Sequence, residues 1–204
     1  MRGVTSRMLT RCIYAAFVGL ASMQLAQGQN LHLSDLNGHE VTTLAAADKH
    51  IVVLIFAATD CPISKRYIPE IARLEQEFSK RNVAFWWVYP NPGDTADVVR
   101  GHAKEFATTT PSLIDSHQRL VRLAHVTVTP EAAIFRVEGS QLREVYHGRI
   151  DDRYLSFSRS RPAATRHELE DAIKAMLAGM TILPPAGGPV GCSIVPLEAL
   201  NRQP

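Results

Sequence analysis

The alternation of apolar and polar side chains predicts strands and helices in turn along the first half of the chain. Residues 51–57 are a continuous apolar run rich in β-branched side chains, which is typical of a central strand covered on both faces. In residues 62–80, apolar side chains recur at spacings of three and four, which predicts a helix with one buried face. A second buried strand is predicted at residues 83–89, and the turn residues 90–93 end it.

Further short elements are predicted on both sides of this region. The Asn37-Gly38 pair within residues 31–50 indicates an N-terminal hairpin. Asp94 is a suitable N-cap for a helix that runs to about residue 106. A short strand at residues 112–114 is then followed by a helix through Leu120 and Leu123.

The last part of the pattern predicts a hairpin and a final helix. Residues 132–137 and 142–146 form two strands joined by a turn at residues 138–140. Thr165 and Glu168 have the spacing of a capping box, so the helix is expected to begin there, to continue to residue 177 and to stop at Gly179.

Composition separates the N-terminus from the rest of the chain. The 204 residues are 46% hydrophobic, which suffices for one full domain. In residues 1–28, three arginines precede an apolar stretch, and small residues follow it, as in a secretory signal peptide. We therefore expect an exported, periplasmic protein. The alternative is an uncleaved membrane anchor, although the apolar stretch of about 14 residues is shorter than the ~20 that span a bilayer.

Removal of this leader changes the charge and cysteine counts. The chain has 22 Lys and Arg against 20 Asp and Glu, and the leader carries three arginines and no acids, so the remainder has 19 against 20. This balance argues against nucleic-acid binding. Of three cysteines, Cys61 and Cys192 remain, and in an oxidising compartment such a pair is a candidate disulfide.

Cys61 lies where the apolar strand stops and the helix begins. Pro62 suits the first helical position, so Cys61 is the expected N-cap, and the unpaired N–H groups there favour thiolate over thiol. Such environments lower the pKa of a free cysteine from about 8.5 to roughly 3.5–7.5. Lys65 and Arg66 act in the same direction, and Ser64 can donate a hydrogen bond to the sulfur. The alternative is that Cys61 is simply a small buried side chain.

At these residues the chain resembles the thioredoxin-like superfamily, and more closely its redoxin-type members, the AhpC/TSA-like and thiol-disulfide-interchange-like exported proteins. In that fold a proline kinks the helix eight residues after the cysteine, as Pro69 would here. A cis-proline faces the cysteine, and Val128-Thr129-Pro130 fits that place. The order strand, helix, strand, helix, hairpin, helix also agrees.

The resemblance implies an α/β thioredoxin-like fold, with a central mixed β-sheet flanked by helices, an N-terminal hairpin extension and a C-terminal tail. The signal peptide would span residues 1–28, the domain residues 29–180, and a flexible tail carrying Cys192 residues 181–204. From residue 177 to Cys192 the chain has 15 residues, and a flexible tether of that length spans about 21 Å. Cys192 can therefore reach Cys61, although it can equally be an incidental tail cysteine.

Departures from the family patterns limit the chemistry. Ser64 stands where a thioredoxin has its second cysteine, which excludes dithiol reduction within one motif. Ala58 and Pro130 replace the Thr and Arg of a typical peroxiredoxin and argue against efficient peroxidase activity. Lys65 replaces the second cysteine of copper-binding relatives, and His102, His125 and His147 are too scattered in sequence to indicate a metal site.

Two further segments allow alternative interpretations. The resemblance to thioredoxin-like proteins implies that a cis-proline at Pro130 leaves a backbone edge free to pair with an extended substrate. An ordinary trans turn at Pro130 would not do so. The charged residues 147–154 follow a strand directly, so they are either a solvated salt-bridged turn or a loop of the site.

The sequence thus predicts an exported thiol-disulfide oxidoreductase that requires no metal or organic cofactor. Cys61 attacks a disulfide or peroxide, Ser64 stabilises the sulfur, Pro130 positions the partner backbone, and Cys192 or an external thiol resolves the intermediate. The expected partners are an exported protein or a small-molecule disulfide or peroxide, together with a thiol reductant. The alternatives are a non-catalytic binding module for an exported partner and a weak thiol peroxidase.

Overall fold

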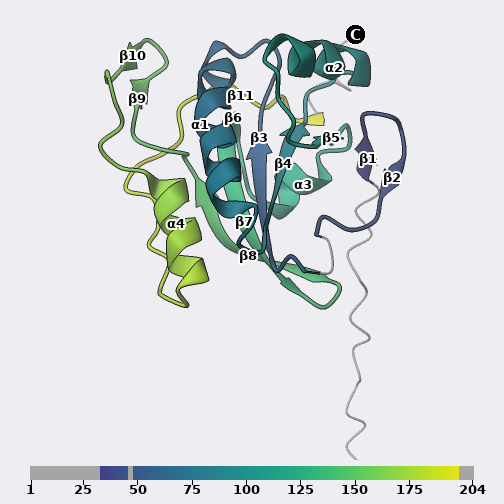
Figure 1. The fold of residues 1–204 in the computed structure, drawn as a ribbon. Helices are drawn as coiled ribbons and strands as arrows, with labels where there is room; N and C mark the ends of the chain where they lie inside the picture. The colour runs from purple at the N-terminus through teal and green to yellow at the C-terminus, as the bar shows by residue number, and fades with distance from the viewer. Residues whose placement is uncertain (1–32, 46–47, 198–204) are drawn as a thin grey trace, which may run out of the picture.

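A seven-stranded mixed sheet forms the centre of the computed structural model, which describes residues 33–45 and 48–197 (Figure 1). Strand β3 (Ile51–Phe56) is parallel to β4 (Val83–Tyr89) on one side and antiparallel to β7 (Glu131–Glu138) on the other. The sheet order is β2-β1-β5-β4-β3-β7-β8. Its other strands are β1 (Leu33–Asp35), β2 (Glu40–Val41), β5 (Ser112–Ile114) and β8 (Gln141–Gly148). The mixed sheet and the N-terminal hairpin agree with the prediction. The predicted leader lies outside the described residues.

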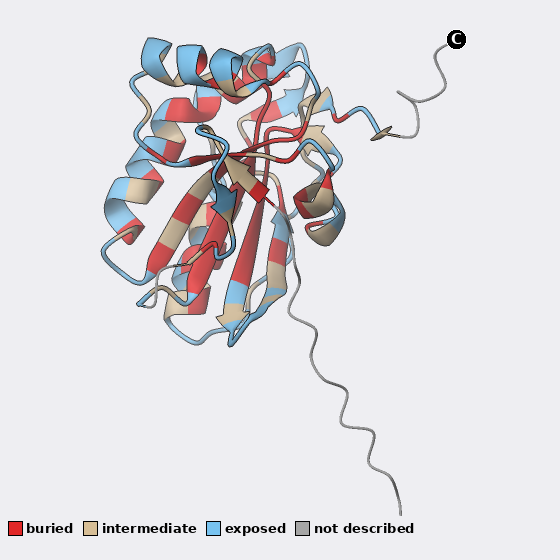
Figure 2. Ribbon diagram, turned by 90° about the vertical axis from the view of Figure 1, so that its right-hand side faces the viewer, coloured by how far each residue is buried: buried red, intermediate tan, exposed pale blue. Residues whose placement is uncertain are grey.

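Strand β3 contributes to two separate hydrophobic cores. Its side chains alternate, because successive residues of a strand point to opposite faces of a sheet. Ile51, Val53 and Ile55 belong to the core that contains buried residues of the helices α1 (Pro62–Phe78), α2 (Ala96–Glu105) and α4 (Glu168–Leu177). The residues between them, Val52, Leu54 and Phe56, belong to the core under α3 (Arg119–Leu123). Burial on both faces explains why the whole strand is apolar (Figure 2).

Two small two-stranded sheets lie outside the main one. Strand β9 (Tyr154–Ser156) pairs with β10 (Arg159–Ser160) in a hairpin near the start of α1. Strand β6 (Val128–Thr129) pairs antiparallel with β11 (Cys192–Ser193), which belongs to the C-terminal tail. Among the described residues, no helix is long and apolar enough to cross a membrane.

Two of the predicted helix starts are wrong, and both for the same reason. Helix α2 is capped by Thr95, whose hydroxyl accepts the N–H of Val98, rather than by Asp94. Helix α4 begins at Glu168 without a side-chain cap, so Thr165 and Glu168 form no capping box. In each case the expected capping residue makes a tertiary contact instead: Asp94 accepts hydrogen bonds from Thr59, and Thr165 donates to Asp152. The predicted helix stop at Gly179 is confirmed, with a positive φ of 66°.

The continuous burial of β3 makes a stability prediction. Leu54 is 0% exposed, so Leu54→Ala leaves a cavity and should lower the free energy of unfolding by about 2–5 kcal/mol. Leu183 is 76% exposed, and Leu183→Ala should change it by no more than about 0.5 kcal/mol. Denaturant unfolding of both variants measures the difference, and equal losses would contradict the assignment of Leu54 to the core.

Candidate active site

Cys61 is the N-cap of α1, as the sequence predicts. Its backbone is extended, with φ −80° and ψ 115°, its carbonyl accepts the N–H of Lys65, and Pro62 occupies the first helical position. The residue is 0% exposed. Because no water reaches the sulfur, the protein itself must supply every polar partner that the thiol or thiolate has.

Three residues contact the Cys61 sulfur. As a thiol it donates a hydrogen bond to the Thr129 carbonyl oxygen, at 3.1 Å. The backbone N–H and the hydroxyl of Ser64 and the thiol of Cys192 are hydrogen-bond donors to it. The buried Ser64 hydroxyl also accepts the Ala58 N–H at 3.4 Å, which fixes its orientation. The structure therefore brings Cys61, Ser64, Cys192 and the residue before Pro130 together.

These contacts separate the pKa values of the two cysteines. Burial raises the pKa of Cys61, but the hydrogen bonds from Cys192 and Ser64 outweigh it, so the pKa lies below its usual value. For Cys192, burial together with the hydrogen bond and the charge of Cys61 raises the pKa to about 12. Of the two thiols, Cys61 is therefore the one that ionises first. Lys65, expected to assist, lies instead over the Phe106 ring, with Nζ at 5.9 Å from its centroid.

The Thr129–Pro130 peptide bond is cis, as predicted, and the sheet register explains its place beside the thiol. Strand β7 begins at Glu131, directly opposite Phe56 at the end of β3. Pro130 therefore lies next to the loop that leads from β3 to Cys61. The buried Glu131 carboxylate accepts the N–H groups of Thr127 and Val128, at 3.0 and 3.4 Å, and holds the segment before the proline in place.

The C-terminal tail corrects two expectations. The edge of β6, predicted to be free, is covered by β11, in which Cys192 lies opposite Thr129. The tail, predicted to be a flexible strap, is docked here: Ile194 N–H bonds to the Thr127 carbonyl at 3.0 Å, and Gln118 donates to the Val195 carbonyl at 2.7 Å. Docking is favoured because Ile194 is buried in the core under α3.

Two functional contacts were missed by the sequence analysis. Asp94 was assigned to a cap, but its carboxylate accepts the N–H and the hydroxyl of Thr59 and so fixes the loop before Cys61. Glu131 was given no role, because the predicted strand began one residue later, at residue 132. One signal in the sequence could have revealed its role: a charged residue stands at the start of an otherwise apolar strand. A charged side chain buried there needs hydrogen-bond partners.

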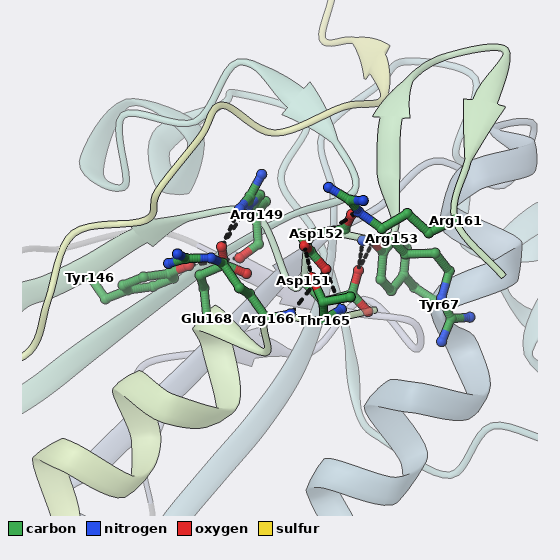
Figure 3. Close-up of polar contacts among 10 residues, drawn as sticks. All are labelled: Tyr67, Tyr146, Arg149, Asp151, Asp152, Arg153, Arg161, Thr165, Arg166 and Glu168. Carbon is green, nitrogen blue, oxygen red and sulfur yellow. Dashed lines mark hydrogen bonds and ion pairs between the residues drawn. The ribbon is translucent and has the colours of Figure 1, made fainter. Parts of the chain in front are cut away.

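The charged segment at residues 147–154 is neither a solvated turn nor part of the thiol site. Asp151 and Asp152 are both buried, and they join the end of β8 to α1 and to the segment before α4 (Figure 3). Asp151 accepts hydrogen bonds from the Tyr67 hydroxyl and the Arg153 N–H. Asp152 accepts the N–H groups of Thr165 and Arg166 at 2.6 and 3.0 Å.

An ion pair completes this polar cluster. Arg149 bonds to Glu168 at the first position of α4, and the Tyr146 hydroxyl donates to the Arg149 carbonyl at 2.7 Å (Figure 3). The contacts of Asp151 with Tyr67, of Asp152 with Thr165 and Arg166, and of Arg149 with Glu168 join segments that are far apart in the chain. The cluster therefore fixes α4 against the sheet, and its charges are structural.

His102, His125 and His147 do not gather at Cys61. His125 and His147, far apart in the sequence, share the Glu144 carboxylate, with Nδ1 to oxygen distances of 3.2 and 2.7 Å. His102 lies elsewhere, against the Phe106 ring. Within the described residues, one group has potential ligand atoms within 4.8 Å of one another: Glu70, His167 and Glu170. The Arg73 guanidinium already pairs with both of its carboxylates, so their charge is balanced.

The role of Ser64 can be tested through the thiolate. Ser64→Ala removes the hydroxyl that donates to the sulfur, so the pKa of Cys61 should rise toward that of a free thiol. The ultraviolet absorbance of the thiolate, followed against pH, measures the change, and Cys192 does not interfere because its pKa is about 12. Ser79→Ala, at the other end of α1, is the control and should leave the titration unchanged. An unaltered titration in Ser64→Ala would exclude its hydroxyl from the site.

The cluster of Figure 3 predicts a pH-dependent stability. Burial raises the pKa of Asp152, but its hydrogen bonds with Thr165 and Arg166 and the nearby Arg161 charge hold it well below the usual range. The ionised carboxylate thus stabilises the folded state above the unfolded pKa of about 3.9, and this stabilisation is lost as the pH falls through the folded pKa.

Asp152→Asn should therefore lower the free energy of unfolding by about 1–3 kcal/mol at neutral pH. The difference from the unmodified chain should shrink as the pH falls below about 4. Urea unfolding across this range measures it. Asp97→Asn, at an aspartate whose side chain is 88% exposed, should show a difference of at most about 0.5 kcal/mol throughout. A difference that stays constant with pH would contradict the proposed stabilising charge.

Comparisons with known proteins agree with this architecture. An uncharacterized conserved protein from Geobacillus kaustophilus is 25% identical, with a TM-score of 0.64 over 82% of this chain and 89% of that one. A hypothetical protein from Sinorhizobium meliloti 1021 is 21% identical, with a TM-score of 0.64 over 79% and 88%. An uncharacterized thioredoxin-like protein from Porphyromonas gingivalis is 22% identical, with a TM-score of 0.51 over 76% and 92%. The predicted thioredoxin-like fold is confirmed.

A family comparison supplies the assignment. No curated protein matches the chain. The family model described as the AhpC/TSA family matches residues 25–146, which include Cys61, Ser64 and Pro130 but not Cys192. The match covers more than half of the 204 residues. This chain belongs to the AhpC/TSA family of thioredoxin-like redoxins.

Proposed function

We propose that the protein is an exported thiol-disulfide oxidoreductase in which Cys61 is the attacking thiolate and Cys192 the resolving thiol. One observation carries the proposal: strand β11 places the Cys192 thiol in hydrogen-bond contact with the Cys61 sulfur, and the contact lowers the pKa of Cys61 while it raises that of Cys192. The same arrangement sets Cys192 opposite Thr129, whose carbonyl oxygen accepts the Cys61 thiol at 3.1 Å, so the two cysteines meet at one backbone position. Family membership supports thiol chemistry at Cys61, and the predicted leader at residues 1–28 supports export.

In the first step the Cys61 thiolate attacks one sulfur of a substrate disulfide. A bond forms between the two sulfurs, the substrate disulfide breaks, and its other sulfur leaves as a thiolate. The Ser64 hydroxyl and the start of α1 stabilise the charge on Cys61 before the attack. A lower pKa increases the fraction of Cys61 that is in the reactive thiolate form at neutral pH.

In the second step Cys192 attacks the Cys61 sulfur of the mixed disulfide. Burial, the hydrogen bond with Cys61 and the charge of the Cys61 thiolate raise the pKa of Cys192, and the last two effects vanish once Cys61 is covalently bound. The pKa of Cys192 then falls, which favours its ionisation at this stage of the cycle. Its attack expels the substrate thiolate and leaves a Cys61–Cys192 disulfide, so two electrons have passed to the substrate. An external thiol reductant restores the dithiol.

The cycle is tested by mapping the cysteines with mass spectrometry. After a stoichiometric disulfide oxidant, the mature chain should yield one peptide pair that joins Cys61 to Cys192. Cys192→Ser should accumulate a mixed disulfide at Cys61, because the second step is blocked, and Cys61→Ser should abolish turnover. If neither cysteine of the unmodified chain reacts, the oxidoreductase assignment fails and a non-catalytic binding module takes its place.

A further inference from the structure

The tail strand β11 lies on the edge of β6 as an extended ligand would. Its residues pair in antiparallel register, with Cys192 opposite Thr129 and Ser193 opposite Val128. The contact continues through the Ile194 N–H and the Thr127 carbonyl, at 3.0 Å, and the Thr129 hydroxyl donates to the Cys192 carbonyl at 3.3 Å. We define residues 127–129 as the β6 edge. Its main-chain groups impose an extended conformation on whatever binds there.

Alternate residues of the tail face the protein. Cys192 points toward Cys61, and Ile194 is buried in the core under α3, whereas Ser193 and Val195 are exposed. A strand that binds by one face in this way has side-chain preferences only at every second position. The two preferences here are a thiol at the first position and an aliphatic side chain two residues later.

Gly191 adds a third preference. A Cβ at this position would lie 2.2 Å from the Thr129 carbonyl oxygen and 2.6 Å from its carbon. Both atoms belong to the backbone of the β6 edge, so neither can move aside as a flexible side chain does. Any residue other than glycine before the cysteine therefore conflicts with this docking. Gly188, three residues earlier, has no atom within 4 Å of such a Cβ.

The docked tail also closes the site. Cys61 is 0% exposed, while Cys192 above it remains partly exposed with its pKa raised to about 12. When β11 leaves, Cys192 moves away from the Cys61 sulfur, and the same departure uncovers the β6 edge beside it.

We propose that the β6 edge binds a cysteine-bearing polypeptide in extended form, with glycine before its cysteine and an aliphatic residue two positions after it, and that β11 occupies this site in the resting chain. The proposal rests on the thiol-disulfide function proposed above and names its substrate class. A partner disulfide binds in place of β11 and exchanges with the Cys61 thiolate, which releases the partner's other sulfur as a thiolate. When the tail binds again it displaces the partner segment, and Cys192 completes the exchange.

The experiment introduces the substitution Gly191→Ala, which adds one methyl group, once in the protein and once in a peptide substrate. The probe is a nine-residue peptide with the sequence of residues 188–196, GPVGCSIVP, its cysteine joined to thionitrobenzoate in a mixed disulfide. Attack by Cys61 on the peptide sulfur releases the coloured thionitrobenzoate and leaves the peptide on the protein. Cys192→Ser is present in every protein tested, so that the adduct is not resolved.

In the full chain, Gly191→Ala should dislodge the tail, which is an intramolecular competitor of the peptide. The release of thionitrobenzoate from the peptide should then be faster by about tenfold or more. Gly188→Ala, the matched control, should not accelerate it. In the peptide, the same Gly191→Ala change should slow the reaction with the dislodged protein by about tenfold or more. An Ile194→Ser peptide should also react more slowly, because the aliphatic contact is lost.

The outcomes are separable. If the glycine and alanine peptides react equally, or if Gly191→Ala and Gly188→Ala proteins behave alike, the substrate preference and the tail's occupation of the site are wrong. The small disulfide dithiobis(nitrobenzoate) checks Cys61 itself on the dislodged protein. Failure to react with this reagent as well would overturn the proposed function and this inference together, whereas reaction with it and no discrimination between peptides would overturn only the inference.

Discussion

The arrangement of the candidate site depends on one constraint: the Cys61 sulfur is removed from water, so the protein must supply its hydrogen-bond partners. Cys61 is buried at the start of α1, so its charge can be stabilised only by donors that the chain itself holds in place. Ser64 comes from the first turn of the same helix and is near by covalent geometry. Thr129 and Cys192 come from distant segments, and bringing them there requires the register of β3 with β7 and the docking of β11.

The rest of the fold can be understood as support for this arrangement. Strand β3 carries two cores on alternate residues, which fixes its position relative to α1 on one face and α3 on the other. Asp94 restrains the loop between β3 and Cys61, and Glu131 restrains the segment before Pro130. The polar cluster around Asp152 fixes the end of β8 and also α4, and the chain after α4 leads through the tail to β11.

The sequence was sufficient for the elements whose signals are local. The run of apolar residues in β3, the helical spacing in α1 and the Cys61-Pro62 start follow from periodicity and capping chemistry. The misassigned caps at Asp94 and Thr165 have suitable side chains, but a partner distant in sequence takes their hydrogen bonds. No local pattern reveals such competition. The docked tail escaped prediction for a related reason: its proline- and glycine-rich composition is that of a flexible linker, while the residues that dock it are few and contact segments far away.

The docked tail links the redox chemistry to residues that never touch a sulfur atom. In the proposed cycle, the disulfide between Cys61 and Cys192 forms only while β11 lies on β6, so the reduction potential of the pair would include the free energy of docking. Burial of Ile194 and the hydrogen bond from Gln118 to Val195 raise the effective concentration of one thiol at the other. Substitutions at such positions would change the reduction potential of the cysteine pair without contacting either sulfur, just as a change of linker changes the avidity of a two-site ligand.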